Sequence, residues 1–171
     1  ITPKTLEPLG KGSGYEHLWK EGVGKADSAN TKFSWLSDGN FYTLTAATQA
    51  EDEVLLVRLG ANDPNFNLRR DAGIIIRKKK VQKATFVNVI ETHGSYSPVT
   101  ENAVNASSSI SNVSVTYEDE DYVAVSITNK NGSTCLFIMA TKDNATSKKH
   151  NLKINGSNYS WTGAKYNTII K

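Results

Sequence analysis

Short apolar stretches separated by tight-turn dipeptides constrain this chain most strongly. Residues 31–36 and 41–45 are rich in aromatic, β-branched and leucine side chains, and they flank Ser37-Asp38-Gly39-Asn40. The Asp-Gly pair supplies the positive φ angles that a tight hairpin turn requires. Asn131-Gly132 and Asn155-Gly156 stand in similar settings further along the chain. These signals predict strands that pair as antiparallel hairpins.

Several of the stretches alternate between apolar and polar residues. Residues 111–117 place Val113, Val115 and Tyr117 on one face of a strand and polar side chains on the other. Residues 122–128 alternate in the same way. A period of two residues indicates strands that have one face in the core and the other towards water.

The remaining strand signals extend over most of the chain, and helix signals are nearly absent. Further strands are expected at residues 53–59, 73–77, 84–90, 134–141, 152–154, 159–161 and 168–170. Only residues 15–20 and 63–68 could form a helical turn. We therefore expect an all-β fold, an antiparallel β-sandwich of about ten to twelve strands. A single domain is expected to span residues 1–171.

Length and charge limit the classes of function. A chain of 171 residues suits one domain with a sizeable core. The net charge of +3 is too small to argue for nucleic acid as a partner. No apolar run approaches the roughly 20 residues needed to span a bilayer, so no membrane span is expected. The chain begins with Ile1 and shows no basic-then-apolar leader, so a signal peptide is expected to be removed or to lie outside it.

Motifs for nucleophilic or metal chemistry are absent from the sequence. There is no Gly-x-Ser-x-Gly elbow, no His-x-x-x-His, no paired cysteines and no EF-hand loop. The single cysteine, Cys135, lies in an apolar stretch and is expected to be a small core residue rather than a thiolate. The acidic run 118–121 is expected to be a solvated turn, with a Ca²⁺ loop as the alternative. We assign no catalytic residue, no metal ligand and no cofactor.

Aromatic residues near the start of the chain are candidates for ligand binding. Tyr15, His17 and Trp19 alternate, so on an extended segment they would share a face. Aromatic faces stack on sugar rings, but a tryptophan in a small β domain more often belongs to the core. Both interpretations stay open for Trp19.

A basic cluster occupies the middle of the chain. Its members are Arg69, Arg70, Arg77, Lys78, Lys79, Lys80 and Lys83. Arginine binds carboxylates or sulfates bidentately and lysine adds a point charge, as a uronic-acid polymer would require. Arg69 and Arg70 are the better candidates because they follow a polar loop. The alternative is that the lysines form a solvated hairpin.

His93 lies between Glu91 and Tyr96, directly after an expected strand and before Gly94. A loop histidine beside a carboxylate and a phenol could act as an acid or a base. The alternative is a hydrogen bond that stabilises the loop. His93 and Tyr96 therefore join the candidates for contact with a substrate.

Three segments resemble a known family. They are YEHLWKEG, VLLVRLGANDPNFNLRRDAG and ATFVNVIETHGSYSPV, which together lie within residues 15–99. They are similar to the region C-terminal to the catalytic core in bacterial heparinase II/III-like polysaccharide lyases, most closely the oligoalginate lyases. The resemblance implies an α/α barrel joined to antiparallel sheets, and cleavage of uronic-acid polysaccharides by β-elimination. In the family, the catalytic Asn, His and Tyr lie on that barrel and a further His lies early in the sheet region. None of these can be placed on this chain, so no catalytic residue is carried over.

The resemblance favours a C-terminal β-sandwich domain of an alginate or glycosaminoglycan lyase. Such a domain would support an upstream catalytic domain of the same chain and hold anionic polysaccharide, and it would be inactive alone. The candidate substrate-binding residues are Tyr15, His17, Trp19, Arg69, Arg70, His93 and Tyr96. The alternatives are an autonomous carbohydrate-binding module and an adhesion sandwich without a ligand. The family implies a periplasmic or secreted protein.

Overall fold

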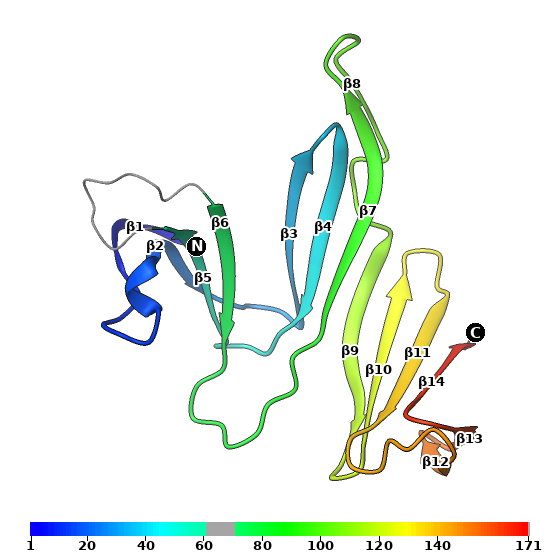
Figure 1. Ribbon diagram of the computed structural model, residues 1–171. Coiled ribbons are helices and arrows are strands. Elements are labelled where there is room, and N and C mark those ends of the chain that lie inside the picture. Colours follow the sequence, from blue (N-terminus) through cyan, green and yellow to red (C-terminus); the bar gives the residue numbers. More distant parts are fainter. Residues whose placement is uncertain (61–70, 171) are drawn as a thin grey trace. The chain divides into compact units, whose positions relative to one another are not determined.

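The regular secondary structure of the described residues consists of antiparallel strands and one 3₁₀ turn (Figure 1). The computed structural model describes residues 1–60 and 71–170. These hold fourteen strands, so the all-β prediction is confirmed, and a β-sandwich fits the arrangement. Among the described residues, no helix has the length and apolar character that a membrane crossing needs.

Backbone contacts divide the chain into two compact units. Unit 1 comprises Ile1–Ser28 and Thr48–Ala84, and unit 2 comprises Ala29–Ala47 and Thr85–Lys171. Each unit builds its own sheets. The single domain expected from the sequence stays a prediction.

Unit 1 is a four-stranded sheet in the order β1-β2-β5-β6. Its strands are β1 (Thr2–Pro8), β2 (Leu18–Lys25), β5 (Glu53–Leu59) and β6 (Asp71–Arg77), and the 3₁₀ turn η1 covers Tyr15–His17. The apolar run in β5 is buried at Val54, Leu55 and Val57 because β5 lies between β2 and β6. The helical turn expected at residues 15–20 is thus present in part, whereas residues 63–68 lie outside the described range.

The first sheet of unit 2 has the order β3-β4-β7-β8. Its strands are β3 (Asn30–Ser37), β4 (Asn40–Ala47), β7 (Asn88–Ser97) and β8 (Asn102–Val104). Asp38 and Gly39 form the turn between β3 and β4 with φ angles of 49° and 74°, which confirms the predicted hairpin. The strand expected at residues 84–90 was placed too early, because β7 begins at Asn88. Residues before it belong to the connection by which the chain passes from unit 1 to unit 2.

The second sheet of unit 2 has the order β14-β11-β10-β9. It is built from β9 (Ile110–Glu118), β10 (Tyr122–Asn129), β11 (Thr134–Ala140) and β14 (Lys165–Ile170). A separate hairpin consists of β12 (Lys149–Ile154) and β13 (Ser157–Thr162). Its turn at Asn155 and Gly156 has φ angles of 49° and 88°, as the sequence predicted.

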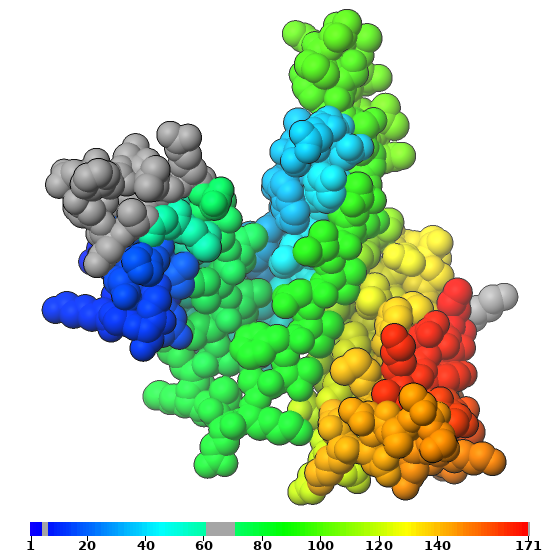
Figure 2. All heavy atoms as spheres, in the orientation of Figure 1, coloured from blue at the N-terminus to red at the C-terminus, as the bar shows by residue number. Residues whose placement is uncertain are grey.

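The β12–β13 hairpin supplies the cover for one face of this second sheet. Figure 2 shows the hairpin, in orange to red, beside the yellow strands β10 and β11. The buried cluster consists of Ala124, Leu136, Ile138, Ile154 and Trp161. The core of unit 2 is therefore a small two-layer sandwich.

One side chain lies on the opposite face from the one that its sequence spacing predicts. Val115 pairs with Val125, but Tyr117 pairs with Ala124, because a bulge shifts the register between them. An extra residue in one strand moves every later side chain to the other face. Tyr117 therefore packs against the core cluster, and its predicted place beside Val115 was wrong.

The two sheets of unit 2 are joined through the side chain of Asn30. Its Oδ1 accepts a hydrogen bond from the Val113 amide at 2.8 Å, and its Nδ2 donates to the Val113 carbonyl at 2.7 Å. Nearby, Lys32 Nζ donates to the Ile110 carbonyl at 2.5 Å. The Asn30 amide thus satisfies the backbone N–H and C=O of Val113 at the edge of β9, as a neighbouring strand would.

The assignment of the two sheet faces can be tested with neighbouring residues of β11. Ile138 is fully buried, whereas Met139 is 55% exposed. We expect Ile138→Ala to lower the free energy of unfolding by about 3 kcal/mol, since it leaves a cavity. Met139→Ala should change it by less than about 0.5 kcal/mol. Urea denaturation of both variants gives the comparison, and equal losses would contradict the assigned core.

Candidate functional site

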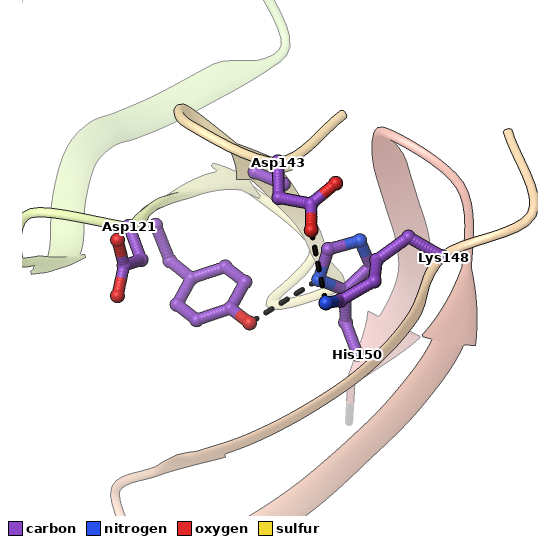
Figure 3. A pocket seen from close by; sticks show the side chains of 6 residues that line it. Asp121, Asp143, Lys148 and His150 are labelled. Atoms are coloured by element: carbon purple, nitrogen blue, oxygen red, sulfur yellow. Dashed lines mark hydrogen bonds and ion pairs between the residues drawn. The ribbon is translucent and has the colours of Figure 1, made fainter. Parts of the chain in front are cut away.

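A hollow of about 250 Å³ lies where β10 begins and β11 ends (Figure 3). Its lining residues are Asp121, Tyr122, Ala140, Asp143, Lys148 and His150. We refer to it as the His150 pocket. Tyr122 opens β10, Ala140 closes β11 and His150 lies near the start of β12. Three strands, the turn before β10 and the loop before β12 therefore contribute.

His150 is the most unusual residue of the pocket. It is only 3% exposed, and its ring stacks on Trp161 with centroids 4.9 Å apart. Nδ1 lies 3.2 Å from the Tyr122 hydroxyl, whereas Nε2 is buried and meets no hydrogen-bond partner among the described residues. Buried polar atoms almost always have a partner. The orphaned nitrogen therefore marks the pocket as a candidate ligand site.

Paired charges surround the pocket. Figure 3 shows Asp143 and Lys148 close to the His150 ring, with Asp121 farther away. Lys148 Nζ lies 2.9 Å from Asp143, and this hydrogen bond raises the pKa of Lys148 and lowers the pKa of Asp143. Asp121 lies 3.3 Å from Lys142. Both carboxylates thus have a cationic neighbour.

This lining is chemically suited to a ligand with several hydroxyl groups. Carboxylates accept hydrogen bonds from hydroxyls, ammonium groups donate to them, and the Tyr122 phenol can do either. Lys148 balances Asp143, whereas Lys142 is shared between Asp121 and Glu120, so the lysines offset only part of the negative charge at the pocket. Its volume is below the range of about 300–1,000 Å³ typical of drug-sized sites, which suits a single sugar ring.

The sequence did not single out this pocket. Its side chains are separated along the chain, and only the pairing of β10 with β11 and the placement of β12 bring them together. The one available signal is the alternation in β12, where His150 shares its face with the core residues Leu152 and Ile154.

The aromatic candidates near the start of the chain do not form one platform. Tyr15 and His17 are exposed in the 3₁₀ turn η1, and Trp19 is buried in β2. A 3₁₀ turn has three residues per turn, so residues two apart do not share a face as they would on a strand. Among the other tryptophans, Trp161 is buried and Trp35 is exposed, stacked on Tyr42.

Much of the basic cluster is paired within unit 1. Lys78 Nζ lies 2.6 Å from Asp52, and both side chains are nearly buried. Lys79 lies 3.1 Å from Glu53, which also binds Arg77. These cations neutralise carboxylates of their own unit. Arg69 and Arg70 lie outside the described residues.

His93 makes hydrogen bonds through both ring nitrogens. Nε2 lies 2.8 Å from Thr43 Oγ1, Nδ1 lies 2.8 Å from the Asn105 carbonyl, and the ring stacks on Phe41. A methyl group at Gly94 on β7 would lie 2.0 Å from the Val104 carbonyl on β8. Only glycine at position 94 therefore lets the backbone of β8 approach β7 this closely. His93 lies within strand β7 and not in the loop that was expected, and its Nδ1 contact ties β7 to the residue that follows β8.

The five candidate residues that the structure describes are divided between the two units. Tyr15, His17 and Trp19 belong to unit 1, whereas His93 and Tyr96 lie on β7 in unit 2. The backbone amide of Tyr96 donates to the Gly39 carbonyl at 2.8 Å. Substrate binding by these residues stays a prediction.

Glu91 anchors the chain segment that precedes β9. Its carboxylate accepts hydrogen bonds from the Ser108 hydroxyl and from the Ser109 amide, the latter at 3.0 Å. Partial burial acts to raise the pKa of Glu91, but these hydrogen bonds outweigh it and hold the pKa below its ordinary value. The charged form is therefore favoured in the folded chain.

Replacing Glu91 should change how stability depends on pH. A carboxyl group whose folded pKa is lowered stabilises the fold above its unfolded pKa of about 4.3, and this contribution is lost as the pH falls through the folded pKa. We expect Glu91→Gln to cost about 1–2 kcal/mol at pH 7 and to weaken the loss of stability below about pH 5. Urea denaturation from pH 3 to 7 measures both, with the exposed Glu101→Gln as control. Parallel profiles for Glu91→Gln and the native chain would contradict this role.

Comparison with known proteins points to one group of enzymes. An alginate lyase of Stenotrophomonas maltophilia (strain K279a) is 34% identical over 162 residues, which are 95% of this chain and 22% of that protein. The chain is similar to part of an alginate lyase. An exo-oligoalginate lyase of Saccharophagus degradans (strain 2-40) is also 34% identical, over 92% of the chain and 22% of its own length. No protein-family model matches the chain.

These matches confirm the resemblance to oligoalginate lyases that the sequence segments suggested. The matched region extends far beyond residues 15–99 and covers nearly the whole chain. The chain spans about a fifth of the length of the curated relatives it matches.

Proposed function

We propose that this chain is the C-terminal β domain of an alginate-degrading polysaccharide lyase. The observation that carries this proposal is the 34% identity over 95% of the chain to a protein more than four times as long as the matched region. The all-β fold agrees with the sheet region that the resemblance implies. The catalytic domain would then lie in the part of the lyase that the match leaves uncovered.

The role of the domain would be to support that catalytic domain and to contact polysaccharide. Cleavage by β-elimination needs a group that takes a proton from the sugar and a group that protonates the leaving oxygen. Both nitrogens of His93 are already bonded, and Nε2 of His150 is buried. We therefore assign proton transfer to the part of the lyase that the match leaves uncovered. The proposal also includes the heparinase II/III-like grouping and a periplasmic or secreted location.

A graft tests the lyase assignment. Residues 1–171 would replace the matching part of the Stenotrophomonas maltophilia alginate lyase, and product formation from alginate would be followed by the ultraviolet absorbance of its unsaturated ends. We expect the graft to retain activity, and the same lyase with that part deleted to lose it. A soluble, folded graft as inactive as the deletion would contradict the proposal.

Within this function, the His150 pocket is the proposed contact for one sugar unit. We expect alginate in a native gel to retard the chain at moderate salt, more strongly than heparin or a neutral glucan. Asp143→Asn and Tyr122→Phe should each weaken binding by about 2- to 10-fold, the value of one hydrogen bond. Asp27→Asn, at an exposed site in unit 1, and Tyr159→Phe serve as matched controls.

Two results would contradict the sugar contact. Retardation by every polyanion that vanishes with salt would indicate charge attraction alone. Equal retardation of the pocket variants and their controls would place any sugar site elsewhere. In the second case an autonomous carbohydrate-binding role would have to rest on another surface, such as the exposed Trp35 and its neighbour Tyr42.

A further inference from the structure

The sheet β14-β11-β10-β9 carries a group of apolar side chains on the face opposite its core, bordered by Glu118, Lys165 and Asn167. Backbone pairing places Val115, Val125 and Phe137 in one row, and Val113, Ile127, Cys135 and Ile169 in the next. Val123 and Met139 form a third pair. We call these side chains the outer face. Its members are Val113, Val115, Val123, Val125, Ile127, Cys135, Phe137, Met139 and Ile169.

Exposure differs among the residues of the outer face, and Val115 on β9 is itself 36% exposed. Val113 is fully buried, next to the backbone bonds with Asn30. Phe137 on β11 is 41% exposed, and Ile169 on β14 is 71% exposed. The described residues thus cover part of the outer face and leave several of its side chains open to solvent.

A sheet with apolar side chains on both faces is typical of an internal layer. Sheets that face water on one side alternate between apolar and polar residues, whereas sheets covered on both sides read as continuous apolar runs. Residues 135–139 form such a run, Cys-Leu-Phe-Ile-Met. Contiguous exposed apolar surface on a folded domain marks an interaction site.

We propose that the outer face is covered, in the intact lyase, by an apolar sheet face from the part of the enzyme that lies outside this chain. This inference rests on the proposed function. The matched region makes up only 22% of each curated relative, so most of such an enzyme is available to provide the cover. Sheets that pack face to face interdigitate apolar side chains in this way.

The chemistry of the outer face argues for a permanent partner within the same protein. It carries aliphatic side chains, one phenylalanine, one methionine and one cysteine. Its polar neighbours lie on the two edge strands: Glu118 on β9, and Lys165 and Asn167 on β14. Permanent interfaces resemble a domain core cut in half, whereas interfaces that form and separate are more polar. Among the nine members, polysaccharide would find only the weakly hydrogen-bonding thiol of Cys135.

The oxidation rate of Met139 reports directly on the cover. Met139 is the only methionine of the chain. Its oxidation by hydrogen peroxide to the sulfoxide would be followed by mass spectrometry of the peptide that contains it. We compare the isolated chain with the same residues grafted into the Stenotrophomonas maltophilia lyase. Val99→Met places a control reporter at a site that is 91% exposed.

We expect Met139 to be oxidised on the order of tenfold more slowly in the graft than in the isolated chain, because access controls this reaction. The reporter at position 99 should react at the same rate in both. Equal rates for Met139 in an active graft would overturn the outer-face proposal and leave the proposed function standing. Loss of activity with Met139 still protected would count against the function and leave the outer face supported.

A second measurement tests the proposal if the graft fails to fold. The isolated chain would be mixed with the remaining part of the lyase, made separately, and Met139 should again become protected. Phe137→Ser with Ile169→Ser should remove that protection, and Val99→Ser should not. Slow oxidation of Met139 in the isolated chain, without the rest of the lyase, would overturn the proposal. If this protection increases with protein concentration, a second copy of the chain covers the outer face. If it does not, the chain covers the outer face itself.

Discussion

In unit 2, β10 and β11 pair with each other and each has another strand on its far side. This pairing determines which side chains enter the core and which remain available for other contacts. Both strands are interior to their sheet, so every backbone bond is satisfied laterally and the side chains must serve the two faces. One face receives Ala124, Leu136 and Ile138, which the β12–β13 hairpin covers. The opposite side carries the residues of the outer face. The sheet is therefore covered by the hairpin on one side and partly exposed on the other.

The same pairing places the His150 pocket. Tyr122 pairs with Ala140 at the end of the β10–β11 ladder, where the core layer stops and the chain turns towards β12. His150 then stacks on Trp161, its partner across the hairpin, and reaches the Tyr122 hydroxyl. A polar pocket at the margin of an apolar core can hold a buried imidazole because the stacked indole and the phenol fix its orientation.

Sequence patterns predicted the features that local geometry controls. Asp38-Gly39 and Asn155-Gly156 require positive φ angles that few other pairs adopt easily, so their hairpins were found where expected. The bulge that turns Tyr117 inward was not predicted, because two residues on β9 oppose one on β10 only after the strands pair. Strands β1, β2 and β8 carry proline, glycine or few residues, and they form as partners of stronger strands. The contact of His150 with Tyr122 spans 28 residues, which no local signal records.

The outer face and the His150 pocket of unit 2 need opposite exposure to solvent, and they lie on opposite sides of the sheet. An apolar face is stabilised when water is excluded from it, whereas a sugar pocket has to stay open to solvent for its ligand to enter. Tyr122 and Ala140 point to the β12–β13 side, and Phe137 and Met139 point to the other. A partner that covers the outer face would therefore leave the His150 pocket accessible. One sheet can in this way join a larger enzyme through one face and contact its polymer beside the other.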